Sequence, residues 1–310
     1  MQKTERIWLD GRLVAWDEAQ VHVLTHSLHY GLAVFEGIRC YECHDGRSAI
    51  FRLREHVDRL YGSAHVLDLP MPFPREQLIE ACLETVRTNR LRECYIRPIA
   101  FLGDGEMGLA ARPATRVAVA AWPWGAYLGD EGLRHGIRVK TSSFQRFHPN
   151  TLLTKAKASG HYVNSILASY EVRRAGYDEA LLLDVDGYVS EASGENVFIV
   201  AGGVAKTTPL PTVLGGITRD AVLRLFAGLG IPCREERFTR DEIYLADEAF
   251  FTGTAAEVTP IRELDDRRIG DGKPGPTTRR LQELFFAIVR GHRPEYRKWL
   301  AFANQPVARA

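Results

Sequence analysis

Two lysines stand two positions apart in residues 154–162, TKAKASGHY, just before a run of small residues and an aromatic one. A lysine amine can attack an aldehyde and form a Schiff base, which makes it a nucleophile for group-transfer chemistry. Paired lysines are equally typical of a solvated surface. An i, i+2 pair shares one face of a strand but opposes on a helix, so the local pattern does not choose between Lys155 and Lys157.

Two glycine-rich or small-residue turns could bind an anion. Residues 215–218, GGIT, precede a helical pattern, where unpaired backbone N–H groups and the helix dipole favour negative charge. Residues 253–256, GTAA, follow an apolar strand and can also present N–H groups. Each motif alone is equally consistent with a plain turn.

Charged residues at three further places could take part in binding. Arg97 shares a strand face with Tyr95 in a mostly apolar segment, so it must find an anion or face solvent. Glu191 and Glu195 lie where a strand meets a tight turn, which also fits simple solvation of the carboxylates. Arg59 lies opposite the apolar stripe of its helix, and periodicity predicts that it is solvated. Together, the lysine, arginine, carboxylate and anion-binding turns suit a phosphorylated aldehyde cofactor.

The elements that must position these groups follow from periodicity and turn signals. In the first part of the chain we predict strands in a hairpin around Asp10-Gly11, a longer hairpin around Asp45-Gly46, strands at CYIRPIAFLG and TRVAVAAW, and helices at about 55–67 and 75–89. In the second part we predict strands at 137–140, EALLLDV, YVSE, NVFIV and EAFFTG, and helices after Tyr162, after Gly216, at Thr239 with a capping box to Glu242, and over 277–290.

Length and composition restrict the class of protein. The chain has 310 residues, which suggests two domains: a small α+β domain over 1–124, a glycine-rich linker over 125–133, and a larger domain over 134–310. Because 40 basic residues are balanced by 39 acidic ones, nucleic acid and anionic membranes are poor candidate partners. The charged N-terminus and the lack of a long apolar segment predict a cytoplasmic protein. Cys40 and Cys43 read as part of a strand, and we expect no metal site there.

Many ordered segments of the chain resemble the branched-chain amino acid aminotransferases, which are class IV, fold type IV pyridoxal-phosphate enzymes. The resemblance runs from about residue 7 to residue 290 and rests on HSLHYGLAVFEGIRCY, FRLREHVDRL, YIRPIAFLGDGEMG, PWGAYLG, KAKASGHY, SEASGENVF, LGGITRD and YLADEAFFTGTAAEVTPI. It implies a two-domain D-amino acid aminotransferase-like fold with an α+β N-terminal domain and a C-terminal pseudo-barrel.

The resemblance also implies the cofactor site. Lys157, rather than Lys155, matches the lysine that forms the Schiff base with pyridoxal 5'-phosphate and transfers the proton. Tyr162 matches the tyrosine at the phenolic oxygen, and Glu191 matches the carboxylate paired with the pyridine nitrogen. Arg59 matches a phosphate-binding arginine, against the periodicity argument. The other phosphate contacts implied are Ile217, Thr218 and Thr254.

The implied substrates are L-leucine, L-isoleucine or L-valine, with 2-oxoglutarate as amino acceptor in a two-step ping-pong reaction. Tyr95 and the turn at Thr254 and Ala255 match the α-carboxylate site, and Arg97 matches the residue that binds the distal carboxylate of glutamate. The apolar pocket would be formed by Phe35, Gly37, Trp124, Tyr127 and Tyr162. Tyr30 and Met107 match positions that reach a neighbouring subunit, which implies a homodimer at least and leaves a trimer of dimers open.

Some residues depart from the family pattern. Gly215, Ser159 and His161 replace residues that are often proline, glycine and asparagine, and Lys206 stands in a strand that is usually apolar. These departures leave the shape of the phosphate loop and the substrate preference open. D-amino acid aminotransferases, (R)-selective amine transaminases and aminodeoxychorismate lyase share the lysine, glutamate and phosphate ligands, whereas the YIRP and PWGAYLG segments favour the branched-chain enzyme. A non-catalytic binding protein would not need the lysine.

Overall fold

The computed structural model describes residues 2–125 and 128–304. The chain divides into two compact units: unit 1 comprises Met1–Gly125, Ala156–Gly160 and Phe286–Ala310, and unit 2 comprises Ala126–Lys155 and His161–Phe285. This division differs from the boundaries expected from sequence in two segments. Residues 156–160 join unit 1 because their backbone pairs with the strand at Val34. The C-terminal segment joins it because strand β17 (Leu300–Phe302) pairs with β5 (Ser48–Phe51).

The sheet of unit 1 contains the two hairpins predicted from the sequence. Its strand order is β17-β5-β4-β6-β7-β1-β2, with β3 also paired to β6. The first hairpin joins β1 (Arg6–Leu9) to β2 (Arg12–Ala15) through Asp10 and Gly11, which both have positive φ. The remaining strands are β3 (Ala33–Phe35), β4 (Ile38–Glu42), β6 (Cys94–Leu102) and β7 (Thr115–Trp122).

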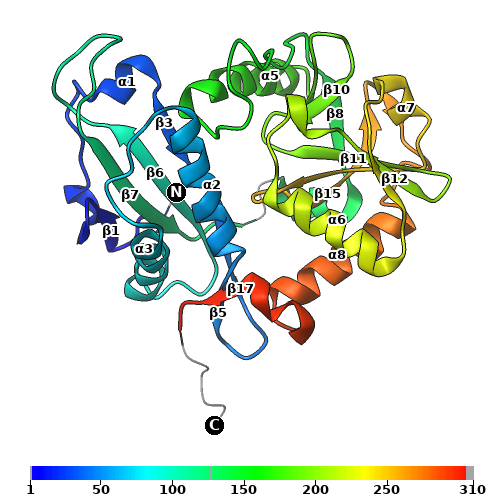
Figure 1. The fold of residues 1–310 in the computed structure, drawn as a ribbon. Helices are drawn as coiled ribbons and strands as arrows, with labels where there is room; N and C mark the ends of the chain where they lie inside the picture. Colours follow the sequence, from blue (N-terminus) through cyan, green and yellow to red (C-terminus); the bar gives the residue numbers. More distant parts are fainter. Residues whose placement is uncertain (1, 126–127, 305–310) are drawn as a thin grey trace. The chain divides into compact units, whose positions relative to one another are not determined.

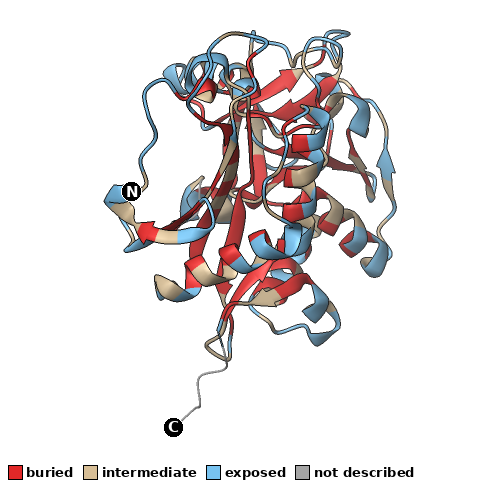
Figure 2. Cartoon of the chain, turned by 60° about the vertical axis from the view of Figure 1, so that its left-hand side comes forward, coloured by how far each residue is buried: buried red, intermediate tan, exposed pale blue. Residues whose placement is uncertain are grey.

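Two helices of fourteen residues cover one face of this sheet, namely α2 (Leu53–Val66) and α3 (Arg75–Thr88) (Figure 1). The predicted stripe on α2 is confirmed, since Val57, Leu60 and Ala64 are buried in the core shared with the strands. Figure 2 shows the result: helices bury one side and expose the other, while the strands are mostly buried. A short helix, α1 (His26–Tyr30), precedes β3.

The sheet of unit 2 has the strand order β10-β9-β8-β15-β14-β11-β12-β13, with β16 paired to β15. The strands that carry the candidate site are β9 (Glu179–Leu183), β10 (Val189–Ala192), β11 (Asn196–Ala201), β14 (Glu248–Gly253) and β15 (Glu257–Leu264). The other strands are β8 (Ile137–Thr141), β12 (Val204–Thr207), β13 (Cys233–Glu235) and β16 (Arg267–Arg268).

The predicted helices of unit 2 are present as α5 (Tyr162–Arg174), α6 (Ile217–Leu229) and α7 (Arg240–Tyr244). The capping box between Thr239 and Glu242 at the start of α7 is confirmed. The last long helix, α8, spans Pro276–Val289. No helix of the described part of the chain is long and apolar enough to cross a membrane.

Two segments differ from the sequence prediction. Helix α4 (Gly129–His135) begins inside the stretch expected to be a linker, with Asp130 and Glu131 in its first turn and Arg134 and His135 in its last. These charges complement the helix dipole, so they stabilise a short helix in a glycine-containing segment. Strand β12, which contains Lys206, forms a hairpin with β11 that the sequence prediction did not include.

Candidate active site

Lys157 is held by backbone contacts to two elements of unit 1. Its N–H donates to the Ser63 Oγ on α2 at 3.0 Å, and its carbonyl accepts the Phe35 N–H at 3.1 Å. The lysine Nζ lies 5.1 Å from the centre of the Phe35 ring. The backbone on both sides of the side chain is therefore fixed, and the amine lies against an aromatic wall, as a positioned nucleophile requires.

Aromatic side chains and an arginine gather around β6. The Tyr95 ring meets the Trp124 ring edge to face, with centroids 4.5 Å apart. The Arg97 guanidinium carbon lies 4.7 Å from the centre of the Phe35 ring, and its Nη2 donates to the Tyr95 hydroxyl at 3.3 Å. Among the described residues, the buried Nε of Arg97 has no hydrogen-bond partner. Such a surface can contact an apolar side chain and still offer a donor to a carboxylate.

The prediction from periodicity that Arg59 is solvated is wrong. Its side chain is only 16% exposed and forms a bidentate pair with the buried carboxylate of Glu36, at 2.6 and 2.9 Å. The apolar stripe of α2 could not reveal this, because the contact depends on a charged residue placed between β3 and β4. Arg59 is thus oriented by unit 1 itself.

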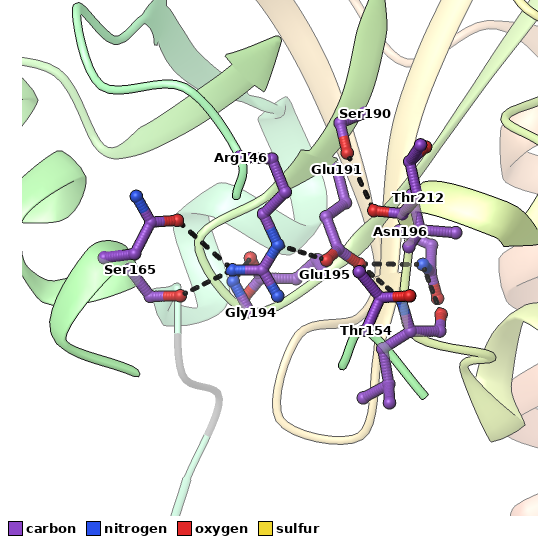
Figure 3. Close-up of polar contacts among 12 residues, drawn as sticks. Arg146, Thr154, Ser165, Ser190, Glu191, Gly194, Glu195, Asn196 and Thr212 are labelled. Carbon is purple, nitrogen blue, oxygen red and sulfur yellow. Dashed lines mark hydrogen bonds and ion pairs between the residues drawn. The ribbon is translucent and has the colours of Figure 1, made fainter. Parts of the chain in front are cut away.

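Glu191 lies at the centre of a polar network in unit 2 (Figure 3). Its Oε1 forms an ion pair with the Arg146 Nε at 2.8 Å. Its Oε2 accepts the Leu214 N–H at 3.2 Å and the Asn196 side-chain amide at 3.4 Å. The carboxylate is only 5% exposed. A buried carboxylate with a cation and two further donors is held as an anion in a fixed orientation.

Asn196 can approach Glu191 because residue 216 has no side chain. The Asn196 amide also donates to the Leu214 carbonyl at 3.0 Å, which joins β11 to the loop before α6. A Cβ on Gly216 would lie 2.0 Å from the Asn196 Oδ1. The glycine of the GGIT motif therefore has a packing role, and it is also the N-cap of α6.

The remaining predicted cofactor residues lie at element ends in unit 2. Ile217 and Thr218 form the first two positions of α6 and are buried. Thr254 and Ala255 lie in the three-residue connection between β14 and β15, where the last paired residues are Gly253 and Glu257. Tyr162 is the first residue of α5. Helix starts and hairpin turns present backbone N–H groups, as phosphate or carboxylate binding requires.

Lys155, predicted to be solvated, lies in an exposed position but has definite partners. Its amine donates to the carbonyls of Leu210 and of Val213, the latter at 3.2 Å. Burial is the main factor that lowers the pKa of this lysine, and the charge of Glu191 opposes that shift. Lys155 thus ties down the loop that supplies the Leu214 N–H to Glu191.

The other predicted residues have mixed outcomes. Tyr30 and Met107 are 43% and 36% exposed, so both are accessible to a partner. Tyr127 lies outside the described residues. Lys206 fits its strand because its amine lies 3.0 Å from carboxylate oxygens of both Glu236 and Glu242.

Sequence reasoning missed five residues that support the predicted site: Glu36, His56, Ser63, Arg146 and Asn196. Glu36 and Asn196 lie inside motifs that were noted, VFEG and SGEN, next to residues that received roles. His56 precedes Arg59 by three positions and therefore shares its helix face, which is a signal the sequence does carry. Nothing in the sequence around Arg146 connects it with Glu191, 45 positions later.

Residues 33–264 match the model of the amino-transferase class IV family, and the chain belongs to this family. It is 52% identical to a branched-chain-amino-acid aminotransferase of Pseudomonas aeruginosa over 294 residues, covering 94% of this chain and 95% of the relative.

Two solved structures extend the similarity to the fold. The branched-chain amino acid aminotransferase of Escherichia coli is 47% identical, with a TM-score of 0.95, and the match covers 97% of this chain and all of that one. A second branched-chain amino acid aminotransferase, solved with pyridoxamine 5'-phosphate, is from T.th. and is 51% identical, also with a TM-score of 0.95; the match covers 98% of this chain and all of that one. The chain therefore has the two-domain fold type IV architecture and is an aminotransferase.

Proposed function

We propose that this aminotransferase transfers the amino group of L-leucine, L-isoleucine or L-valine to 2-oxoglutarate, and catalyses the reverse reaction. The observation that carries the substrate assignment is the surface around β6. Phe35, Tyr95 and Trp124 can contact a branched apolar side chain, while Arg97 beside them can bind the second carboxylate of glutamate. One surface can thus serve both half-reactions, as a ping-pong transaminase requires.

The residues of the chain fit pyridoxal 5'-phosphate, the cofactor that the similarity to the aminotransferase structures supports. Glu191 is a fixed anion suited to a protonated ring nitrogen. Arg59, Ile217, Thr218 and Thr254 offer a cation and element ends suited to a phosphate. When bound, the cofactor supplies an electron sink and carries the amino group between substrates.

Each protein group has a defined task in this proposal. Lys157 binds the aldehyde of the cofactor, and its Nζ then takes the proton from the substrate Cα and returns it. Tyr162 hydrogen-bonds the phenolic oxygen, and Glu191 keeps the ring nitrogen protonated. Tyr95 and the turn at Thr254 and Ala255 receive the α-carboxylate. Phe35, Gly37, Trp124, Tyr127 and Tyr162 line the apolar pocket.

We assign the minimal active unit to a homodimer, with further assembly into a trimer of dimers open to test. Apolar side chains of unit 1 that no core covers support this assignment: Val23 is 70% exposed, Leu28 64% and Leu109 91%. They lie near Tyr30 and Met107 in the sequence, the two residues assigned to a neighbouring subunit. An apolar surface of this kind is typical of an interface. The proposed domain division is a small domain to residue 124 and a large domain from residue 134, and the proposed location is the cytoplasm.

Product analysis tests the substrate assignment. The purified protein is incubated with pyridoxal 5'-phosphate, 2-oxoglutarate and one amino donor: a branched-chain L-amino acid, D-alanine or (R)-1-phenylethylamine. L-glutamate should form from the branched-chain donors. Formation of D-glutamate from D-alanine alone, or turnover of the amine alone, would assign the chain to another activity of the family. Chromatography with light scattering tests the dimer.

A further inference from the structure

Glu36 is a fully buried carboxylate between β3 and β4 that makes three close polar contacts in unit 1. Its Oε1 lies 2.6 Å from the Arg59 Nε, and its Oε2 lies 2.9 Å from the Arg59 Nη2. The Oε2 also lies 2.7 Å from the Nδ1 of His56, which is 1% exposed. An ionised carboxylate can only accept, so the histidine carries its proton on Nδ1.

This geometry constrains Arg59 more than a single ion pair would. A bidentate contact along one edge of the guanidinium fixes both the plane and the direction of the group. The carboxylate is itself fixed, because the Glu36 N–H donates to the Pro98 carbonyl at 2.9 Å and His56 holds one oxygen. The arginine direction is therefore set by a rigid, buried partner.

The same two elements hold the backbone of Lys157. Ser63, one turn after Arg59 on α2, accepts the Lys157 N–H, and Phe35, the residue before Glu36, donates to the Lys157 carbonyl. The buried cluster and the lysine segment thus share α2 and the end of β3. A cluster serving only the core would have no need of this shared framework.

We propose that Glu36 is a positioning residue for cofactor binding, which aims Arg59 at the cofactor phosphate and is braced by His56. The proposal rests on the assignment of Arg59 to the phosphate under the proposed function. Glu36 touches neither substrate nor cofactor in this role and acts through the arginine alone.

The test compares two ligands of the apoenzyme, pyridoxal 5'-phosphate and pyridoxal, which lacks the phosphate. Dissociation constants are measured by titrating the visible absorption of the lysine-bound ligand. In Glu36→Gln the amide keeps the shape of the side chain but replaces one acceptor by a donor, so the bidentate contact is lost. Affinity for pyridoxal 5'-phosphate should fall about tenfold, a typical effect of removing an outer-layer partner, whereas affinity for pyridoxal should not change. An equal fall for both ligands, or no fall for either, would overturn the proposal.

Two further variants separate the possible failures. Arg59→Gln should also lose affinity for the phosphorylated ligand selectively; if it does not, the phosphate assignment itself fails. If Arg59→Gln is selective and Glu36→Gln is not, only the positioning role fails. Glu179→Gln is the matched control, because Glu179 is another fully buried glutamate, located in unit 2. It should leave the ratio of the two dissociation constants at the wild-type value.

His56 provides a second route in case Glu36→Gln does not fold. His56→Leu removes the donor to Glu36, whereas in His56→Asn the amide nitrogen can replace the Nδ1. The leucine variant should weaken pyridoxal 5'-phosphate selectively, by less than Glu36→Gln would, and the asparagine variant should restore the affinity. If both histidine variants bind both ligands as the wild type does, the bracing role of His56 and the proposal are refuted.

Discussion

Gly37 and Tyr95 are packed so closely that no other residue fits at position 37. A Cβ built on Gly37 would lie 1.8 Å from the Tyr95 hydroxyl oxygen, a distance that real Cβ atoms do not show. Tyr95 in turn accepts a hydrogen bond from Arg97 and packs against Trp124. The absence of a side chain at position 37 therefore determines where three proposed substrate-binding residues lie.

Gly37→Ala should displace the Tyr95 ring and lower kcat/KM for L-leucine by about tenfold or more, because the methyl group must take the space of the hydroxyl. The overpacking should also cost about 1–3 kcal/mol in the free energy of unfolding. Steady-state kinetics and urea denaturation measure the two effects. Gly62→Ala is the control: residue 62 lies on α2 with open space around it, so alanine should be neutral or slightly stabilising. Wild-type kinetics in Gly37→Ala would contradict the packing argument.

Arg146→Met should destabilise the protein by about 3–5 kcal/mol, because Glu191 would remain buried without its cation. The two side chains are 11% and 6% exposed, so solvent cannot replace the contact. Urea unfolding of the apoenzyme measures the change without any contribution from the cofactor. In the control, Arg54→Met, an exposed pair with Glu76 is lost, which should cost less than about 1 kcal/mol. Similar losses in both variants would show that the Glu191 network has no special importance for stability.

The buried cluster in unit 1 should make the protein sensitive to acid. Burial raises the pKa of Glu36, but the charges and hydrogen bonds of Arg59 and His56 outweigh this, so the net pKa lies well below its usual range. Burial is also the main factor that lowers the pKa of His56, against the effect of Glu36. Both groups bind fewer protons in the folded state than in the unfolded state, so stability rises with pH across each interval.

The contribution of His56 should be complete above its ordinary pKa of 6.5 and should decrease as the pH falls below that value. The contribution of Glu36 should decrease below about pH 4.5, its ordinary value. Urea midpoints of the apoenzyme between pH 8 and pH 4 measure this dependence. His56→Asn, which cannot titrate, should flatten the curve between pH 6.5 and its acid end. An unchanged slope would mean that His56 is not responsible.

Lys157→Ala should abolish the visible absorption of the bound cofactor, because no other amine is assigned to its aldehyde. Lys155→Ala should retain the band, since that amine contacts the carbonyls of Leu210 and Val213. Spectra of the two variants reconstituted with pyridoxal 5'-phosphate provide the comparison. A lost band in Lys155→Ala with a retained band in Lys157→Ala would reverse the assignment.

Arg97→Ala should reduce kcat/KM for 2-oxoglutarate about tenfold or more, because the distal carboxylate loses a charged donor. The effect on 4-methyl-2-oxopentanoate should be less than about threefold, since that substrate has no second carboxylate. Acceptor kinetics with each 2-oxo acid measure the two values. Equal reductions would show that Arg97 supports the surface in general and does not select the carboxylate.

Local signals in the sequence predicted most elements of the fold. The turn at Asp10-Gly11, the apolar stripe of α2 and the capping box at Thr239 each depend on residues within a few positions of one another. Helix α4 was missed because its glycines indicate a loop, while its stability comes from charges at both ends. The membership of residues 156–160 in unit 1 was missed because it depends on pairing with Val34, more than 120 positions earlier.

The candidate site shows the same limit more clearly. Lys157, Glu191 and Arg97 could be named because their motifs resemble those of a known family. Their supporting partners, Arg146 and Glu36, could not, because an ion pair leaves no local pattern when its members are distant in sequence. Periodicity gave the wrong environment for Arg59, since it treats every charged residue opposite the stripe as solvated. A buried carboxylate on another element reverses that expectation.

Helix α2 carries both Arg59 and Ser63, the one assigned to the cofactor phosphate and the other bonded to the backbone of Lys157. Four residues of α-helix span about 6 Å along the axis, and a helix of this length does not stretch. The helix therefore acts as a gauge: it sets the distance between the point where a phosphate is bound and the amine that awaits an aldehyde. A cofactor analogue with its phosphate one methylene further from the ring would satisfy only one end of that gauge.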